Sequence, residues 1–163
     1  MREIAILLVY GEGGHRTEMK RLYSLLKEEN KSDKYKFIGI CENTKMIIEL
    51  DENYSIRPLR DKYSNLITLI NIPISILNYI KLYYKLIKKY EIVSVISSGP
   101  GIAIPISLFF KLLGKKIIFI EDWCRFESMS TTGRIMYKIA DKFYIQNKSL
   151  QKYYPNAIYG GLL

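Results

Sequence analysis

A continuous apolar run near the N-terminus, residues 4–10, constrains the fold of this chain more than any other feature, and a glycine-rich segment follows it at once. A strand that is apolar on both faces is typical of the centre of a parallel sheet, because helices cover such a sheet on both sides. Stretches with helical spacing then alternate with further short apolar runs at residues 35–40, 54–58, 92–97, 116–120 and 142–146. This alternation predicts a single α/β domain, residues 1–163, with a Rossmann-like parallel sheet and helices on both faces.

The stretches between these strands are predicted helices. Apolar residues recur at helical spacing over residues 16–29. The longest stretch, residues 65–90, mixes apolar residues with lysines and is expected to kink or restart near Pro73. The remaining predicted helical segments are residues 43–50, 102–113, 131–140 and 149–153. The sequence shows no internal repeat or low-complexity linker, which agrees with one domain.

Charge and composition restrict the class of function. The chain of 163 residues has 25 Lys and Arg against 16 Asp and Glu, a formal charge of +9, which indicates an anionic partner: nucleic acid, a membrane surface or a phosphorylated ligand. Two cysteines and one histidine are too few for a disulfide framework or a structural zinc site, so a reducing cytoplasmic compartment is expected. Neither a signal peptide nor an uncharged apolar stretch of about 20 residues is present.

Three segments that directly follow predicted strands are the candidate ligand-binding loops. In parallel α/β sheets, ligands bind outside the carboxyl ends of the strands, so loops at these positions converge on one site if the strand order brings them together. The candidate residues are Gly11, Gly13, Gly14 and His15 in the first loop, Ser98, Gly99, Pro100 and Gly101 in the second, and Glu121 and Arg125 in the third.

The first loop joins a buried strand to the start of a helix, where backbone amides and the helix dipole suit a phosphate or diphosphate. It matches neither the dinucleotide-binding pattern Gly-x-Gly-x-x-Gly nor a Walker motif, and a tight turn without a ligand is the alternative. His15 is the only histidine of the chain. On its chemistry alone it could be a general base, a phosphate contact or a structural residue.

The other two loops have equally plain alternatives. The second, with two glycines and two hydroxyls at a helix start, is either an anion-binding nest or an ordinary strand-to-helix turn. In the third, the adjacent carboxylates Glu121 and Asp122 together with Arg125 could orient a sugar or anchor a diphosphate, or form a solvated salt-bridge turn. Cys124 has no base partner in the sequence, so a catalytic thiol is not expected.

One face of the predicted helix 65–90 is rich in lysine. Lys81, Lys85 and Lys88 share this face, and Tyr84 is among the aromatic and apolar residues beside them. This arrangement favours an interfacial helix, with the four residues in contact with an anionic membrane surface. The alternative is a helix that covers the sheet and turns a solvated lysine face outward.

Taken together, these residues resemble a known family. They are similar to the membrane-anchor subunit of the eukaryotic split UDP-GlcNAc transferase, which acts on dolichol-diphosphate-GlcNAc, and more closely to its prokaryotic counterparts in capsular and exopolysaccharide assembly. The matches run nearly end to end and in order: Gly11-x-Gly13-Gly14-His15-x-x-Glu18-Met19, Ser98-Gly99-Pro100-Gly101-x-x-x-Pro105, Glu121-x-x-x-Arg125, Ser130-x-Thr132-Gly133, Tyr137-x-x-Ala140-Asp141-x-Phe143, Gln146, and Tyr154-Pro155-x-Ala157-x-Tyr159-Gly160. The chain departs from the family pattern at Asp122, where serine is usual, at Trp123 and Cys124, and at Asn147, where tryptophan is common.

The resemblance implies half of a GT-B glycosyltransferase, equivalent to the N-terminal, acceptor-binding domain of the peptidoglycan lipid-linked GlcNAc transferase. A separate partner subunit would supply the domain that holds most of the UDP-sugar, and the chain alone is expected to be inactive. Eukaryotic members have an N-terminal transmembrane helix that this sequence does not show. Attachment is therefore expected to be peripheral, at the cytoplasmic face of the membrane, and the sequence ends where a fused enzyme would cross into its second domain.

The predicted activity is inverting transfer from a UDP-sugar to a lipid-diphosphate-linked saccharide in polysaccharide or oligosaccharide biosynthesis. His15 is the leading candidate for removing the proton of the acceptor hydroxyl. The glycines, Ser98 and Pro100 would line the acceptor diphosphate or the interdomain cleft, and Glu121 and Arg125 the acceptor side. No metal or other cofactor is expected, since no Asp-x-Asp motif is present.

Two other classes of function are also compatible with parts of the sequence. The chain could be a non-catalytic membrane anchor that activates its partner, in which case His15 would be only structural. A nucleic-acid-binding Rossmann module rests on the +9 charge alone and lacks a recognised binding motif, so no nucleic-acid partner is expected.

Overall fold

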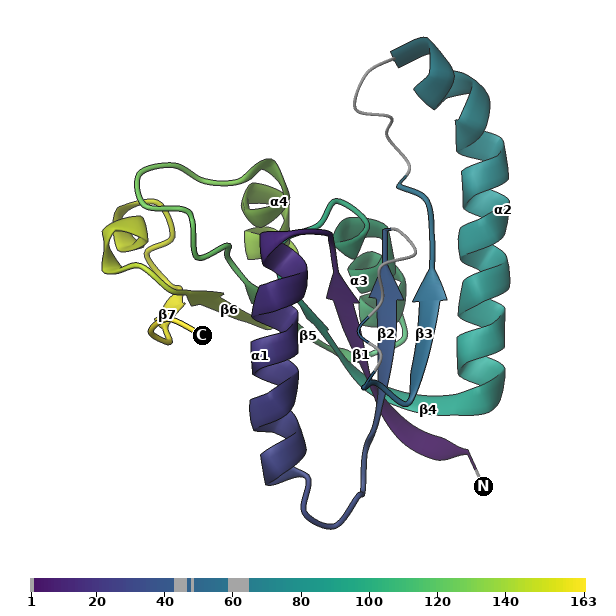
Figure 1. Cartoon of the computed structure of the whole chain (residues 1–163). Helices are drawn as coiled ribbons and strands as arrows, with labels where there is room; N and C mark the ends of the chain where they lie inside the picture. The colour runs from purple at the N-terminus through teal and green to yellow at the C-terminus, as the bar shows by residue number, and fades with distance from the viewer. Residues whose placement is uncertain (1, 43–46, 48, 59–64) are drawn as a thin grey trace.

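The fold is built on a seven-stranded sheet in the order β3-β2-β1-β4-β5-β6-β7, with every neighbouring pair parallel (Figure 1). The computed structural model describes residues 2–42, 47, 49–58 and 65–163, with the side chains of all of these except residues 65–74. The strands are β1 (Glu3–Tyr10), β2 (Lys36–Cys41), β3 (Glu52–Ser55), β4 (Tyr90–Ser97), β5 (Lys116–Ile120), β6 (Lys142–Ile145) and β7 (Ile158–Tyr159). The helices are α1 (Gly14–Glu29), α2 (Asn65–Lys89), α3 (Ala103–Leu112), α4 (Thr131–Ile139) and the 3-10 helix η1 (Lys148–Lys152).

The predicted strands and helices are found, with small shifts at their ends. The third strand begins two residues earlier than expected, and α2 runs through Pro73 as one helix instead of restarting there. The two-residue strand β7 was not predicted, because two residues are too few to show a periodic pattern. Most of the helix expected over residues 43–50 lies outside the described residues.

Residues of β1 enter both hydrophobic cores, as its unbroken apolar run predicts. Ala5, Leu7 and Val9 pack on one side of the sheet, and Leu8 and Tyr10 pack on the other. Successive side chains of a strand point to opposite faces, so only a strand covered on both sides needs apolar residues throughout.

The two faces of the sheet are covered unequally (Figure 1). Buried residues of α2, α3 and α4 share one core cluster, and the ring of Tyr83 on α2 stacks on Phe109 of α3 at 4.0 Å between centroids. On the other face, α1 is the only helix of the described chain that contributes buried residues to the cluster. A cavity of about 300 Å³ remains there, between Leu22 and Leu26 of α1 and Ile118, Ile120 and Tyr144 of the sheet.

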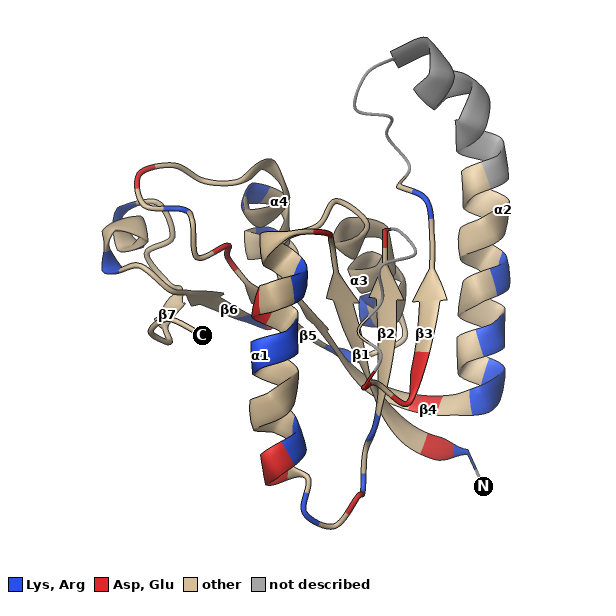
Figure 2. Cartoon of the chain, viewed as in Figure 1, with Lys and Arg blue, Asp and Glu red and all other residues tan. Residues whose placement is uncertain are grey.

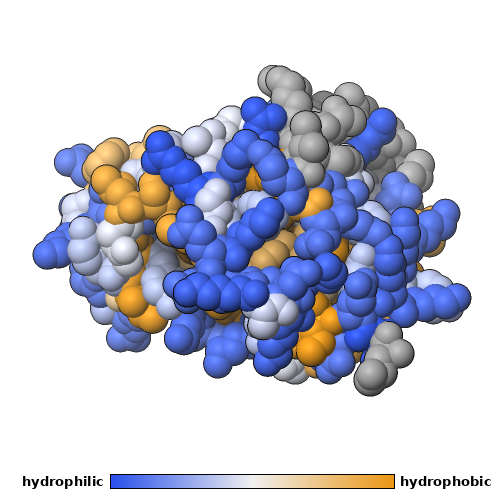
Figure 3. Space-filling model, turned by 60° about the horizontal axis from the view of Figure 1, so that its bottom comes forward, coloured by the Kyte–Doolittle hydropathy of each residue, from blue (hydrophilic) through white to orange (hydrophobic). Residues whose placement is uncertain are grey.

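The two ends of the sheet also differ. The surface at the amino ends of the strands is mostly hydrophilic, with apolar side chains visible between the charged ones (Figure 3). The loops that the sequence marks as candidate ligand-binding segments lie at the opposite, carboxyl end, because each directly follows a strand. The candidate site therefore lies at the carboxyl end of the sheet.

Candidate active site

The first two candidate loops meet at the point where the strand order reverses. β1 lies between β2 and β4, so the loops after β1 and β4 leave the sheet side by side, which is where parallel α/β sheets bind ligands. A Cβ atom on Gly11 would lie only 3.2 Å from Cβ of Pro100. The Ser98 hydroxyl donates a hydrogen bond to the His15 carbonyl oxygen at 3.1 Å. The predicted convergence of these loops is therefore observed.

The imidazole of His15 packs directly on the loop after β4. Gly99 has φ +91°, a conformation that L side chains rarely adopt, and a Cβ atom there would lie 2.8 Å from Nδ1 of His15. Two independent reasons therefore favour glycine at position 99: the positive φ of its backbone, and the His15 ring that occupies the space of a side chain. Its close contact is with His15 and leaves no room for a ligand between them.

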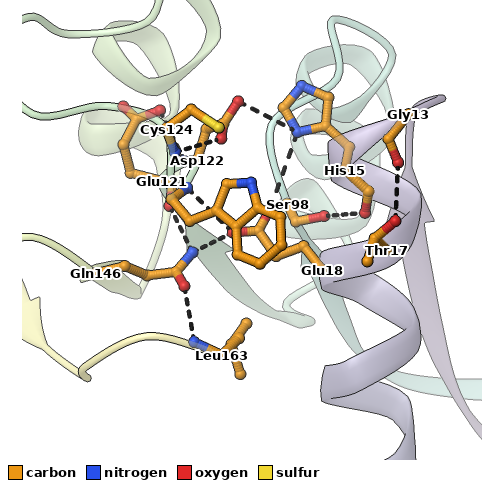
Figure 4. A network of polar contacts seen from close by, with 11 residues as sticks. Gly13, His15, Thr17, Glu18, Ser98, Glu121, Asp122, Cys124, Gln146 and Leu163 are labelled. Carbon is orange, nitrogen blue, oxygen red and sulfur yellow. Dashed lines mark hydrogen bonds and ion pairs between the residues drawn. The ribbon is translucent and has the colours of Figure 1, made fainter.

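His15 turns one ring nitrogen toward two carboxylates and the other away from them (Figure 4). Nδ1 lies 3.8 Å from Oδ2 of Asp122 and 4.0 Å from Oε2 of Glu18. Both distances are longer than a hydrogen bond but within the range of an ion pair. The side chain of His15 is 28% exposed, that of Asp122 22%, and that of Glu18 is fully buried. Nε2 faces away from both carboxylates.

These acidic groups raise the pKa of His15 above its ordinary value. Glu18, whose carboxylate faces Nδ1, has the largest effect; burial of the ring opposes it, and Asp122 and Glu42 add to the rise. The imidazolium form is therefore stabilised, as a base that takes up a proton during a reaction requires.

Glu121 does not occupy the position that the sequence analysis assigned to it. Its side chain is fully buried, and its carboxylate accepts hydrogen bonds from the Tyr154 hydroxyl at 2.5 Å and the Asp122 amide at 3.2 Å. The expectation that Glu121 contacts substrate is therefore revised: it joins the end of β5 to the segment after η1. The neighbouring Asp122 is the carboxylate that reaches His15.

The segment that carries Asp122 is held in place by a residue that the sequence analysis did not select. The side-chain amide of Asn147 donates to the carbonyl oxygens of Trp123 at 2.8 Å and Arg125 at 2.7 Å. The Arg125 guanidinium contacts Ser128 Oγ at 3.4 Å within the same segment. Asn147 could not have been recognised from a motif, because its two partners lie more than twenty residues earlier in the sequence.

The predicted substrate contacts differ in how exposed they are. Gly13 and Gly101 have no atom within 4 Å of a Cβ position, so open space lies beside both. Gly13 is also the N-cap of α1 and leaves the first amides of that helix without a side-chain cap. The exposed members are Gly13, Gly14 and Gly101, Gly99 and Arg125 are half-buried, and Gly11, Ser98, Pro100 and Glu121 are buried. An anionic ligand could therefore make direct contact with the three exposed glycines and with Arg125.

One donor atom each from His15, Glu18 and Asp122 lies within 4.8 Å of the others, a spacing compatible with a metal ion as well as with a histidine held between two carboxylates. The expectation that no metal is required stays a prediction.

The four predicted membrane contacts are all exposed on α2. Tyr84 is 65% exposed, and Lys81, Lys85 and Lys88 are exposed beside it. Figure 2 shows basic residues along the described part of this helix. Further exposed apolar side chains lie on α2 and α3: Ile76, Leu77, Ile80, Leu108 and Leu112, the last 87% exposed.

The opposite side of α2 packs on the sheet through Tyr79, Leu82, Tyr83 and Leu86. The helix therefore covers the sheet and also exposes apolar groups beside its lysines. No helix in the described ranges combines the length and apolar character needed to cross a bilayer.

The parallel sheet and its covering helices form a Rossmann-like domain, and its fold matches one domain of enzymes with the GT-B fold. The crystal structure of Acinetobacter baumannii MurG superimposes with a TM-score of 0.59 at 15% identity, over 90% of this chain and 42% of MurG. Phytolacca americana UGT2, solved with UDP-2fluoro-glucose and pterostilbene, gives a TM-score of 0.57 at 9% identity, over 90% of this chain and 48% of UGT2. At these identities the likeness concerns the fold, and the chain spans less than half of either enzyme.

The chain belongs to the Alg14-like family of oligosaccharide biosynthesis proteins, whose model matches residues 6–163. The UDP-N-acetylglucosamine transferase subunit ALG14 of Homo sapiens is 29% identical over 180 residues, which cover 97% of this chain and 82% of the human protein. The protein of the same name from Candida albicans is 26% identical over 176 residues, with coverage of 100% and 80%. The family resemblance and the GT-B fold class predicted from the sequence are confirmed.

Proposed function

We propose that this chain is the acceptor-side subunit of a two-component, UDP-sugar-dependent glycosyltransferase that acts on a lipid-diphosphate-linked saccharide. Its relatives are named as subunits of a UDP-N-acetylglucosamine transferase, and its fold is that of one domain of GT-B enzymes. A donor-binding partner would hold most of the UDP-sugar, and the chain alone would be inactive. The observation that carries a catalytic role is the arrangement of His15, with Nδ1 between two carboxylates and Nε2 turned away from them.

In the proposed reaction, Nε2 of His15 takes the proton from the attacking hydroxyl of the acceptor. The hydroxyl oxygen forms a bond to the anomeric carbon of the donor sugar, and the bond from that carbon to the UDP oxygen breaks. UDP leaves with the electron pair, and the anomeric configuration is inverted. Asp122, 3.8 Å from Nδ1, stabilises the positive charge that the ring gains when it takes up the proton.

The diphosphate of the acceptor would lie at the open end of α1. Gly13 leaves space beside the uncapped amides of the first helical turn, and Gly101 leaves space on the facing loop. Amides at a helix N-terminus donate hydrogen bonds to phosphate oxygens, and the helix dipole favours their negative charge. These positions support a diphosphate beside the hydroxyl that His15 deprotonates.

We also propose that the outer side of α2 rests on the cytoplasmic surface of the membrane. Lys81, Lys85 and Lys88 would meet anionic headgroups, while Tyr84 and the exposed Leu112 of α3 would enter the interface between headgroups and acyl chains. Tyr83 and Phe109 stack between the two helices, so both present their exposed groups from one packed surface. A lipid-linked acceptor would then reach the site without leaving the bilayer.

A transfer assay with UDP-GlcNAc and a lipid-diphosphate-sugar acceptor tests the proposal. It compares this chain alone, the donor-binding partner alone, both together, and both with His15→Ala. Only the pair should be active, and the variant should lose on the order of 10²- to 10⁴-fold in turnover, the usual contribution of a general base. Full turnover of the variant pair would instead make this chain a non-catalytic anchor and activator.

A further inference from the structure

Glu18 is a buried carboxylate that the proposed reaction does not yet use. It lies one helical turn after His15 on α1, and its side chain is fully buried. A buried carboxylate is unfavourable unless its oxygens are hydrogen-bonded, because burial removes the water that would otherwise solvate them. The partners of its two oxygens therefore matter.

One oxygen of Glu18 has its partners fixed by the backbone. Oε1 accepts hydrogen bonds from the Trp123 amide at 3.3 Å and from the side-chain NH₂ of Gln146. Gln146 cannot be reversed without loss, because its NH₂ also donates to the Glu121 carbonyl at 3.0 Å and its oxygen accepts from the Leu163 amide at 3.0 Å. These contacts present a donor to Oε1 and fix that oxygen as an acceptor.

The other oxygen, Oε2, faces His15. It is buried and has no hydrogen-bond partner among the described residues, and the same is true of Nδ1 of His15, 4.0 Å away. An ionised carboxylate oxygen only accepts, so the complement of Oε2 is an N–H group on Nδ1. A proton on Nδ1 of the neutral ring leaves the lone pair on Nε2, where an acceptor hydroxyl would need it.

We propose that Glu18 is a positioning residue that holds neutral His15 as the Nδ1–H tautomer, and so keeps Nε2 free to accept the substrate's proton. The catalytic meaning of this role rests on the proposed function, in which His15 is the base. Asp122 also faces Nδ1, but it is partly exposed and lies on a loop, whereas Glu18 is buried on a helix. The third acidic group that acts on His15 is Glu42, after β2.

The single histidine of the chain allows the tautomer to be observed directly. In the full chain labelled with ¹⁵N-histidine, the two imidazole nitrogens of His15 give the only histidine signals. At a pH above the pKa of His15, Nδ1 should show the chemical shift of a protonated nitrogen and Nε2 that of an unprotonated one. The opposite assignment in the unmodified chain would overturn the proposal without any variant.

Glu18→Gln is the informative substitution because it keeps the shape of the side chain. The Gln146 and Trp123 donors hold the oxygen of the new amide, so its NH₂ must face Nδ1, which then becomes the acceptor. The proton should move to Nε2, and the two ¹⁵N signals should exchange character. In the assembled pair, kcat should fall by at least about 10²-fold while KM for the acceptor stays within about twofold, because the wrong tautomer disables the base and leaves binding intact.

Asp122→Asn is the matched control, since it removes the other carboxylate and should leave the Nδ1–H tautomer in place. Retention of Nδ1–H in Glu18→Gln, or its loss in Asp122→Asn alone, would assign the role to Asp122 and overturn the proposal. The tautomer measurement needs neither partner nor sugar. It can therefore succeed even if His15→Ala retains full transfer, an outcome that would reject the proposed function and not the position of the proton.

Discussion

The cluster around His15 and the outer side of α2 are both candidate functional regions, but they are built in opposite ways. His15 is 28% exposed and depends on a fully buried Glu18, whereas Tyr84 on α2 is 65% exposed among exposed lysines. In the first region, the imidazole of His15 lies at set distances from two specific carboxylates. In the second, charged and apolar groups act as a sum, as in most contacts with an anionic surface. Single substitutions should therefore have large effects in the first region and small, additive effects in the second.

Gly99→Ala should give the largest combined loss of stability and transfer among the substitutions outside the His15 and Glu18 side chains, and so tests whether the first region is rigid. The new Cβ would lie 2.8 Å from Nδ1 of His15, on a backbone with φ +91°. We expect a loss of stability of about 1–3 kcal/mol and a fall in transfer on the order of 10²-fold, because the ring must move. Chemical denaturation and the paired transfer assay measure the two effects.

Gly114→Ala is the control for this substitution. Its φ is +71°, but no atom lies within 4 Å of its Cβ position. Backbone strain alone should lower its stability by about 1 kcal/mol and leave transfer unchanged. Equal transfer by both variants would show that the contact between Gly99 and His15 does not matter.

Asn147→Ala should have the next largest effect, by loosening the segment that carries Asp122. The substitution removes the hydrogen bonds to the carbonyl oxygens of Trp123 and Arg125. We expect a loss of about 1–2 kcal/mol in the free energy of unfolding, with faster amide hydrogen exchange in residues 122–126. Asn156→Ala, at an exposed position, should change neither quantity. Unchanged exchange in Asn147→Ala would show that the segment is held by other contacts.

The pH dependence of transfer should reveal how far the neighbouring carboxylates raise the pKa of His15. Because its pKa is raised above 6.5, the share of neutral base, and with it kcat/KM, should still rise with pH above that value. Asp122→Asn removes one contribution to the rise and should move the midpoint to lower pH. An unchanged midpoint would show that Asp122 does not affect the pKa of His15.

The contribution of His15 to the free energy of unfolding should fall as pH rises, whereas kcat/KM should rise. A raised pKa in the folded state means that the carboxylates stabilise the protonated ring. This contribution is fully present below the unfolded pKa, near 6.5, and is lost as pH rises through the pKa of the folded state. Denaturation midpoints of the unmodified chain and His15→Gln should therefore converge as pH rises through that range.

The smallest effects are expected from the lysines of α2. Lys81→Ala, Lys85→Ala and Lys88→Ala should each weaken binding to vesicles with anionic lipid by about 1 kcal/mol, or roughly fivefold, at low salt. The effects should add in the triple variant and shrink as ionic strength rises. Lys31→Ala makes the same change of charge in the loop after α1 and is the control. Equal binding by Lys31→Ala and the α2 variants would mean that net charge, not this surface, attracts the chain.

Much of this architecture could be predicted from local patterns. The apolar run of β1 predicted a central strand, and its position between β2 and β4 confirms it. The glycines after β1 and β4 were recognised because special backbone conformations and helix starts leave a signature in adjacent residues. The end of β3 and the two-residue β7 were harder to predict from the sequence, because short edge strands show little periodicity.

The roles of neighbouring acidic residues could not be predicted in the same way. Glu121 and Asp122 are adjacent and chemically alike, yet one is buried against Tyr154 and the other faces His15. Glu18 shares a helix with His15, and its spacing places both on one side of α1. Its partners Trp123 and Gln146 are more than a hundred residues away in the sequence.

The sequence by itself determined the succession of strands and helices along the chain, the parallel sheet, the family, and the loops that would carry the site, because these depend on periodicity and on short motifs. Only the tertiary structure decided which side chains face one another there: that Gly99 packs on the ring of His15, that Asp122 and not Glu121 reaches it, and that Glu18 is buried behind it. The physical reason is that burial and pairing between distant residues depend on strand order and loop conformation, which no local pattern encodes.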